Sequence, residues 1–162
     1  MRKLIASTFV SLDGVMQAPG GPEEDPTGGF AFGGWTFSFW DEVMGGSMKG
    51  LDGKNRELVL GRRTYEIFEA YWPYQPADSE LARTFNAAKK HVASRTLDTV
   101  DWNNSTLLRG DVATAVAALK AEAGDEFPII SSRNLIYSLR AASTIGAFDV
   151  GTFPDGLGGG KR

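Results

Sequence analysis

The stretch Leu58–Pro73, LVLGRRTYEIFEAYWP, sets the pattern from which the fold can be read. Its apolar start is typical of a buried strand and stops at Gly61, and a helix-like run over residues 64–72 follows, ended by Pro73. Two arginines stand where this helix begins. A helix N-terminus already carries partial positive charge, so this arrangement predicts an anion between the arginines, either an acidic side chain or a ligand phosphate.

The alternation of strand and helix recurs along the chain. Strands are predicted over residues 4–12, 57–60, 91–94, 105–108, 127–130 and 148–153. Helices are predicted over residues 40–48, 64–72, 79–90 and 133–142, and between the cap Asp111 and Gly124. This order favours an α/β fold with a largely parallel sheet covered on both faces, in a single domain over residues 1–162.

Composition narrows the classes of function. The chain has 162 residues and a formal net charge of -3, without a basic block, so a nucleic-acid partner is not expected. It has no cysteine and one histidine, His91, so neither a metal site nor a Ser-His-Asp triad is expected as the basis of its chemistry. Neither a signal peptide nor a membrane-spanning run is recognised in the sequence, so we expect a cytoplasmic protein without a membrane partner.

Three predicted strands end in polar turns suited to anions. These turns are Gly61-Arg62-Arg63-Thr64, Ser94-Arg95-Thr96 and Ser131-Ser132-Arg133-Asn134. In a parallel sheet such turns meet at one edge, where ligands bind. Arginine pairs with phosphate in bidentate fashion, and hydroxyl and N–H groups can satisfy the remaining oxygens. An arginine at a helix start is more often a solvated surface residue, but the three turns together predict a ligand with several phosphates.

The motifs LVLGRRTYE, HVASRTL and ISSRNLIYSL, in this order and spacing, resemble the dihydrofolate reductase-like superfamily. The closer likeness is to the C-terminal reductase domain of the bacterial riboflavin-pathway deaminase/reductase, whose first strand and late glycine loop are similar to STFVSLDGVM and LGGGKR. The resemblance implies a three-layer α/β/α sandwich, NADPH as cofactor, and hydride transfer to a small pteridine- or pyrimidine-like heterocycle.

The resemblance also implies a set of cofactor-binding residues. Those implied to hold adenosine-side phosphates are Arg62, Arg63, Thr64, Ser94 and Arg95, and Gly61 is implied to be a further cofactor-binding residue. Those implied to face the diphosphate are Ser131, Ser132, Arg133 and Asn134, and those implied to lie by the nicotinamide are Ala6, Leu12 and Gly14. The chain departs from the family at Ser131, where glycine is usual, at Gly146-Ala147, where an acidic pair is usual, and at Asp155-Gly156. A catalytically idle nucleotide-binding relative that acts through dimerisation is therefore kept as an alternative to a reductase.

Three carboxyl groups are candidates for the proton donor that a reduction needs. These are Asp13, Asp41 and Glu42, because a carboxyl in an apolar pocket keeps its proton near neutral pH. The aromatic residues Trp35, Phe39 and Trp40 could form that pocket and stack on a flat substrate. The simpler interpretations are the acidic first turn of a surface helix for Asp41-Glu42, and core packing for the aromatics.

Two further expectations concern the substrate side and assembly. The Gly- and Pro-rich loop Gln17–Gly34 is either a mobile lid or a disordered excursion, and its aromatic residues favour the lid. A homodimer is expected through Phe148, Val150 and Phe153 at a sheet edge, because relatives carry one more strand beyond the position of Arg162.

Overall fold

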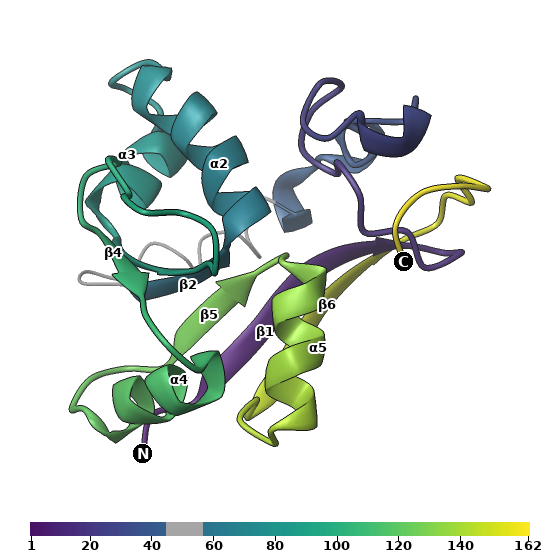
Figure 1. Cartoon of the computed structure of the whole chain (residues 1–162). Helices are drawn as coiled ribbons and strands as arrows, with labels where there is room; N and C mark the ends of the chain where they lie inside the picture. Colours follow the sequence, from purple (N-terminus) through teal and green to yellow (C-terminus); the bar gives the residue numbers. More distant parts are fainter. Residues whose placement is uncertain (45–56) are drawn as a thin grey trace. The chain divides into compact units, whose positions relative to one another are not determined.

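The computed structural model describes residues 1–44 and 57–162, and their elements alternate as the sequence predicts (Figure 1). The strands are β1 (Leu4–Ser11), β2 (Glu57–Gly61), β3 (Lys89–Ala93), β4 (Ser105–Leu108), β5 (Phe127–Ile130) and β6 (Ala147–Phe153). The α-helices are α2 (Arg62–Tyr71), α3 (Glu80–Ala87), α4 (Val112–Ala121) and α5 (Arg133–Ala141). Short 3-10 turns η1 (Thr27–Gly29) and η2 (Phe37–Phe39) lie between β1 and β2, and η3 (Trp72–Tyr74) lies between α2 and α3. Of the helix predicted over residues 40–48, residues 42–44 are helical and residues 45–48 lie outside the described part.

The strands form one six-stranded sheet in the order β4-β3-β2-β5-β1-β6. The four strand pairs with a defined register, β4 with β3, β3 with β2, β2 with β5 and β5 with β1, all run parallel. Parallel neighbours need crossover connections, and helices α2 and α3 lie in the connection between the neighbours β2 and β3. The predicted α/β class with a mostly parallel central sheet is confirmed.

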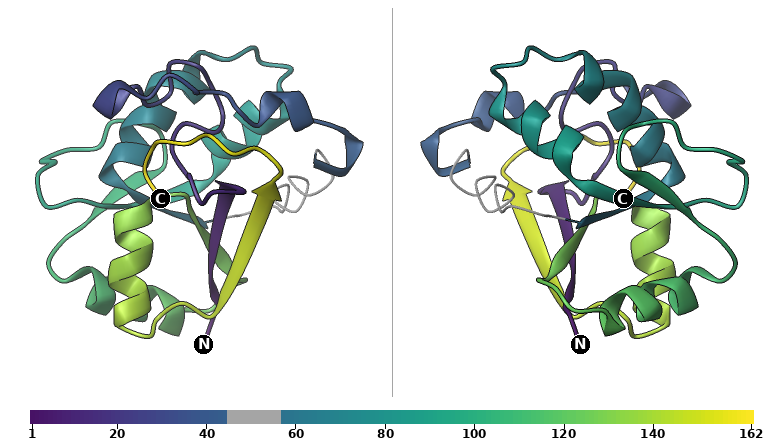
Figure 2. Two further views of the ribbon diagram at one scale, coloured as in Figure 1. Left: turned by 90° about the vertical axis from the view of Figure 1, so that its right-hand side faces the viewer. Right: turned by 90° about the vertical axis from the view of Figure 1, so that its left-hand side faces the viewer.

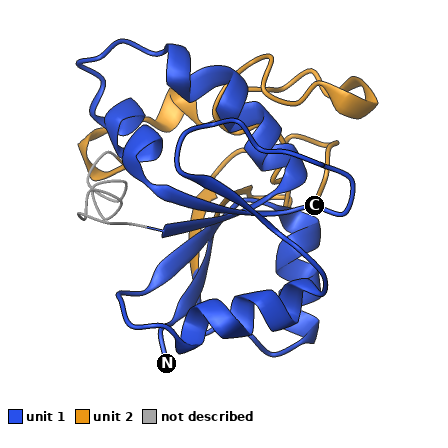
Figure 3. Cartoon of the chain, turned by 60° about the vertical axis from the view of Figure 1, so that its left-hand side comes forward, with its two compact units in different colours: residues 1–7, 52–148 blue, residues 8–51, 149–162 orange. Residues whose placement is uncertain are grey.

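The described chain divides into two compact units, which Figure 3 colours separately. Unit 1 comprises Met1–Ser7 and Asp52–Phe148, and unit 2 comprises Thr8–Leu51 and Asp149–Arg162. In unit 1, α4 and α5 lie on the same side of the strands (Figures 1 and 2). They cover one continuous apolar core of Leu4, Val59, Val116, Leu119, Phe127, Ile129, Leu135 and Leu139.

The opposite face of the sheet in unit 1 is formed by the strand residues that alternate with the core residues, because successive side chains of a strand point to opposite faces. Leu58 and Leu60 are buried there, and their strand partners Lys90 and Val92 share the face. The Lys90 ammonium donates to the carbonyls of Phe85, Asn86 and Ala88, at 2.8, 3.3 and 2.7 Å. It lies 4.0 Å from the centroid of the Trp102 ring, a cation–π contact.

The C-terminal end of α3 differs from the predicted one. The sequence predicted this helix over residues 79–90. The helix instead ends at Ala87, because Lys89 and Lys90 begin β3 and pair with Glu57 and Leu58 of β2. Lys90 nevertheless binds carbonyls at the C-terminal end of α3, now from the neighbouring strand.

Unit 2 has its own aromatic core, so the loop Gln17–Gly34 is not a disordered excursion. Val15, Ala18, Phe30, Trp35 and Phe153 are buried together, and Phe9 and Phe39 pack against them. The loop is tied by its own polar groups: Gln17 Nε2 donates to the carbonyls of Asp25 and Thr27, and Trp35 Nε1 donates to the Gln17 carbonyl at 2.8 Å. Whether this packed loop opens as a lid stays a prediction.

The burial of Phe153 corrects part of the predicted dimer surface. This side chain is 5% exposed and meets the rings of Phe9, Trp35 and Phe39 edge-on. Phe148 and Val150 remain 58% and 47% exposed on β6. Phe153 therefore stabilises unit 2 and does not supply apolar surface for a partner.

Candidate cofactor site at the strand ends

Three neighbouring strands of unit 1 end at the same level. Gly61 of β2 pairs with Ala93 of β3, and Ala93 pairs with Leu108 of β4. The next residues along the chain are Arg62-Arg63 after β2, Ser94-Arg95 after β3 and Arg109 after β4. Because the strands are parallel, these residues lie along one edge of the sheet, and Arg62, Arg63, Arg95 and Arg109 are called the strand-end arginines below.

Arg62 connects two of these turns. Its Nη1 donates to Thr96 Oγ1 at 2.6 Å, and its Nε donates to Glu66 Oε1 at 2.7 Å across one turn of α2. The acidic side chain that the sequence allowed as the anion is therefore present as Glu66. Half of the Arg62 side chain stays exposed, at 51%, so its pairing with Glu66 leaves surface for a ligand.

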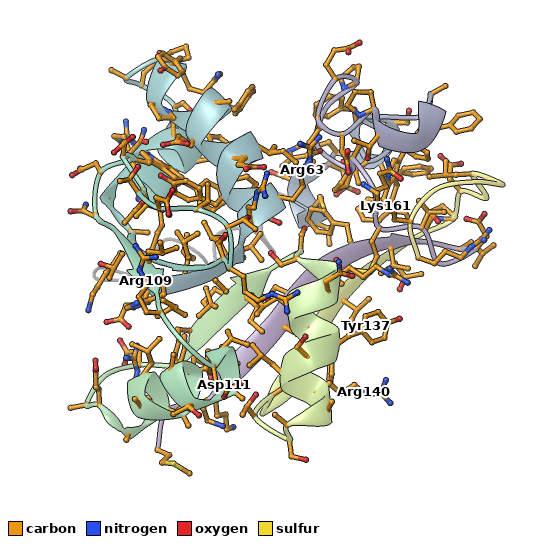
Figure 4. All side chains as sticks on the ribbon, viewed as in Figure 1. Arg63, Arg109, Asp111, Tyr137, Arg140 and Lys161 are labelled. Carbon is orange, nitrogen blue, oxygen red and sulfur yellow. The ribbon has the colours of Figure 1, made fainter. Side chains whose placement is uncertain are left out.

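The turn after β3 is held by the Ser94 hydroxyl. Its oxygen accepts hydrogen bonds from the backbone N–H groups of Thr96 and Leu97, at 3.1 and 3.0 Å. Ser94 thus fixes the turn with its own oxygen, as serine does in tight turns, and Arg95 projects exposed beside it. Arg63 is likewise exposed at the start of α2 (Figure 4).

Arg109 is a site residue that the sequence interpretation missed. It follows β4 as the other arginines follow their strands, and that position was the available signal. Its Nη2 donates to the Asp98 carbonyl at 2.7 Å. The next helix, α4, is capped by Asp111, whose carboxylate accepts from the Thr114 N–H at 2.8 Å; this bond and the Thr114 hydroxyl lower the pKa of Asp111 (Figure 4).

The turn after β5 has an unusual backbone. Ser131 and Ser132 have φ of 51° and 55°, the left-handed region that glycine adopts most readily. The Ser132 hydroxyl accepts from the Gly61 N–H at 2.8 Å and lies 2.9 Å from Thr64 Oγ1 and 3.0 Å from the Ile130 carbonyl. The structure thus brings the turns after β2 and β5 into direct contact.

The remaining residues of the β5 turn open helix α5. Arg133 and Asn134 are both exposed, and the Arg133 guanidinium lies 5.2 Å from the centroid of the Tyr137 ring. Ala6, implied to lie by the nicotinamide, is 1% exposed and pairs with Ile129 of β5. Its neighbour Ser7 accepts the Ser131 N–H at 2.9 Å, which ties β1 to the same turn.

The proton-donor role predicted for Asp13 does not fit its surroundings in unit 2. The carboxylate accepts from the Ser11 hydroxyl at 2.6 Å and from the N–H groups of Leu157 and Gly158 at 3.1 and 2.8 Å. These bonds, the Ser11 hydroxyl foremost, hold the pKa of Asp13 well below its ordinary value. Asp13 is thus an ionised anchor for the glycine-rich segment, next to the exposed Leu12 and to Gly14, which has a φ of +87°.

The apolar pocket predicted around Asp41 and Glu42 is absent from the described structure. Both carboxyl groups are exposed, and Asp41 Oδ1 accepts the Met44 N–H at 2.8 Å, as a helix cap does. This geometry supports the simpler interpretation, an acidic first helical turn.

The three aromatic residues predicted as a substrate platform divide by burial. Trp35 is 6% exposed and belongs to the core of unit 2, so it offers no free face for stacking. Phe39 is half-buried, with its ring 5.8 Å from that of Phe153. Trp40 is 42% exposed and is the one of the three with accessible ring surface.

His91 belongs to a charged cluster at the other end of β2. Its Nε2 lies 3.2 Å from Glu57 Oε2, which also accepts from Arg2 Nη1 at 3.0 Å. Burial lowers the pKa of His91, and the Glu57 carboxylate opposes that shift. Within residues 1–44 and 57–162, no three His, Cys, Asp or Glu residues gather as a metal site, and no helix is long and apolar enough to cross a bilayer.

Comparison with known proteins identifies a matching family model and a solved structure with a similar fold. The family model described as the RibD C-terminal domain matches residues 2–162. A solved structure, "Dihydrofolate reductase from Enterococcus faecalis complexed with NADP(H)and RAB-propyl", is similar with a TM-score of 0.55 and 16% sequence identity, over 99% of this chain and 75% of that chain. A search of curated proteins gives no match.

Proposed function

Because this chain belongs to the RibD C-terminal domain family, a family of the riboflavin-pathway reductase type, we propose that it is an NADPH-dependent reductase. Its proposed reaction is hydride transfer to a small pteridine- or pyrimidine-like heterocycle. The observation that carries the proposal is the alignment of the strand-end arginines along one edge of a parallel sheet.

The residues present fit a phosphate-bearing cofactor. A 2′-phosphate needs several fixed cations, and the strand-end arginines supply them from three adjacent strands, with Arg62 held by Thr96 and Glu66. Thr64, Ser94 and the turn Ser131-Ser132-Arg133-Asn134 supply hydroxyl and N–H donors for a diphosphate. Ala6, Leu12 and Gly14 are proposed to lie by the nicotinamide, which supplies the hydride when the cofactor is bound.

The proton that completes the reduction has no donor among Asp13, Asp41 and Glu42 in the environments described above. Asp13 is ionised by its hydrogen bonds, and the other two carboxyl groups are exposed. We therefore propose that solvent water supplies this proton, and that Trp40 contacts the substrate ring.

Cofactor titration tests the proposal. NADPH and NADH are each added to the wild-type protein while tryptophan fluorescence is followed, and NADPH should bind more tightly. Arg95→Ala should weaken NADPH binding by ~1.5–3 kcal/mol, the scale of a hydrogen bond to a charged group, with little effect on NADH. Arg140→Ala, which removes an exposed arginine from the opposite end of α5, is the matched control (Figure 4). Equal wild-type affinity for the two cofactors contradicts the proposal.

A catalytically idle relative that binds a nucleotide is the second candidate. Two observations favour it: side chains at Ser131 and Ser132 in a left-handed turn, and hydrogen bonds that lower the pKa of the predicted donor Asp13. Stopped-flow oxidation of bound NADPH in the presence of pteridine and pyrimidine substrates distinguishes the two. Tight NADPH binding without any substrate-dependent oxidation favours the idle relative.

A further inference from the structure

The turn after β5 puts serine where the backbone favours glycine. Ser132 has φ of 55° and ψ of 53°. It directly precedes α5, but its side chain makes no capping hydrogen bond to that helix. A non-glycine residue in the left-handed region is held there by its surroundings at a cost in free energy. The contacts of the Ser132 hydroxyl therefore indicate what holds this residue in the left-handed conformation.

The Ser132 hydroxyl is bonded to the neighbouring turn and to β5, because it accepts from the Gly61 N–H and donates to Thr64 Oγ1 and to the Ile130 carbonyl. Gly61 lies at the start of α2, where no side chain of that turn caps the helix, and its N–H points to Ser132 Oγ at 2.8 Å. The buried Thr64 hydroxyl lies 2.9 Å from the same oxygen. An oxygen that accepts an N–H group at a helix start occupies the position that a phosphate oxygen takes in anion sites.

The space around this oxygen is already filled. A Cβ placed on Gly61 would lie 3.1 Å from both Cβ and Oγ of Ser132, so the two turns are in tight contact. A phosphate oxygen cannot reach the Gly61 N–H and the Thr64 hydroxyl while Ser132 Oγ stays between them. Ser132 is half-buried and Thr64 is 8% exposed, so solvent does not offer a second route.

We infer that Ser132 is an internal competitor of the cofactor phosphate and so sets the affinity of this site. This inference rests on the proposed function, because it concerns the same phosphate turns. Binding of a phosphate rotates the Ser132 hydroxyl away and exchanges a neutral hydrogen bond for a charge-assisted one. The free energy gained when the phosphate binds is reduced by the loss of the internal hydrogen bond of Ser132. Removal of the Ser132 hydroxyl should therefore tighten binding.

Two substitutions at Ser132 separate the hydroxyl from the backbone. Ser132→Ala removes the oxygen and keeps the Cβ in the left-handed region, which leaves the Gly61 N–H without this partner. Ser132→Gly removes the oxygen and also relieves the backbone, so it remains informative if Ser132→Ala fails to fold. Ser138→Ala is the matched control, since Ser138 is an exposed serine of α5 whose hydroxyl donates to the Asn134 carbonyl at 3.0 Å.

The probes are inorganic pyrophosphate and NADPH, each titrated by calorimetry into the wild type and the three variants. We expect Ser132→Ala and Ser132→Gly to bind both probes about five- to tenfold more tightly than the wild type, from the net contribution of the one neutral hydrogen bond that no longer has to be broken. Ser138→Ala should behave as the wild type.

The outcomes keep the two proposals apart. If pyrophosphate binds the Ser132 variants more tightly and NADPH binds none of the proteins, the reductase proposal fails and the competitor role stands. If NADPH binds the wild type and the Ser132 variants equally, the competitor role is overturned and the reductase proposal stands. Weaker binding to the Ser132 variants makes the hydroxyl a direct phosphate ligand and also overturns the inference, as does a failure of all four proteins to bind pyrophosphate.

Discussion

Asp25→Asn should destabilise the protein in a pH-dependent way, because Asp25 joins two distant segments of unit 2. Its side chain is 8% exposed, and Oδ2 accepts from Lys161 Nζ at 2.6 Å. Oδ1 accepts from the Thr27 hydroxyl at 2.6 Å. The Lys161 N–H also donates to Gln17 Oε1 at 3.0 Å, so the contact closes the loop onto the C-terminal segment.

The magnitude follows from the shifted pKa. Burial disfavours the Asp25 carboxylate, but the Lys161 ammonium and the Thr27 hydroxyl outweigh it and lower the pKa from the ordinary 3.8 to about 2. A difference of about 1.8 corresponds to about 2.4 kcal/mol of stability at neutral pH. Lys161 is 48% exposed and screened by water, so its own share is about 1 kcal/mol or less.

The direction of the pKa shift determines the pH range in which ionised Asp25 stabilises the protein. A carboxyl group whose pKa is lowered by folding stabilises the protein fully above its unfolded value, near 3.8, and loses this contribution as the pH falls through the folded value. Urea unfolding of the wild type and Asp25→Asn at pH 6 should differ by about 2 kcal/mol. At pH 2.5 the difference should fall to about a third of that value.

Two lysine variants complete the measurement. Lys161→Ala should cost about 1 kcal/mol at pH 6. Lys3→Ala, which removes an exposed lysine of unit 1, should cost much less. A difference between the wild type and Asp25→Asn that is the same at pH 6 and pH 2.5 would refute the assignment of stability to this ionised contact.

Three further predictions need simpler measurements. Deleting residues 17–29 should lower turnover and leave NADPH binding nearly intact, since the phosphate turns lie elsewhere in the chain; loss of NADPH binding in a folded deletion variant contradicts the lid assignment. A homodimer through the exposed Phe148 and Val150 should sediment as about twice 17.5 kDa at micromolar concentration, and a purely monomeric boundary rejects it. Asp111→Ala should lower the midpoint of thermal unfolding through loss of the α4 cap, and an unchanged midpoint argues against that cap.

The order of strands and helices could be predicted because each element carries a local signal. The runs Ser105–Leu108 and Phe127–Ile130 are strands with the predicted bounds, since turn residues flank both apolar segments. The polar turns could be placed on one edge for the same reason, because parallel strands must end together. Arg109 was missed because the adjacent Asp111 cap gave that turn a sufficient structural explanation.

What could not be predicted depends on contacts between residues distant in sequence. The ionised state of Asp13 comes in part from N–H groups of Leu157 and Gly158, more than a hundred residues away. The burial of Phe153 depends on Phe9 and Trp35, and periodicity in β6 carries no information about them. The left-handed serines are a third case, since Ser131 bonds to Ser7 and Ser132 to Gly61, and these contacts between distant residues oppose the preference of serine.

The enclosure of Lys90 has a practical consequence for chemical labelling. Its amine is fully buried among three carbonyls and the Trp102 ring, and burial lowers its pKa to about 8, so a mildly alkaline solution already holds part of it in the nucleophilic form. An acylating reagent can modify the exposed amines of Lys3 and Lys89 in the folded protein, but it reaches Lys90 only when β3 parts from α3. The rate of Lys90 acylation, followed by mass spectrometry, therefore reports the rate at which unit 1 opens. The surface lysines serve as the internal standard.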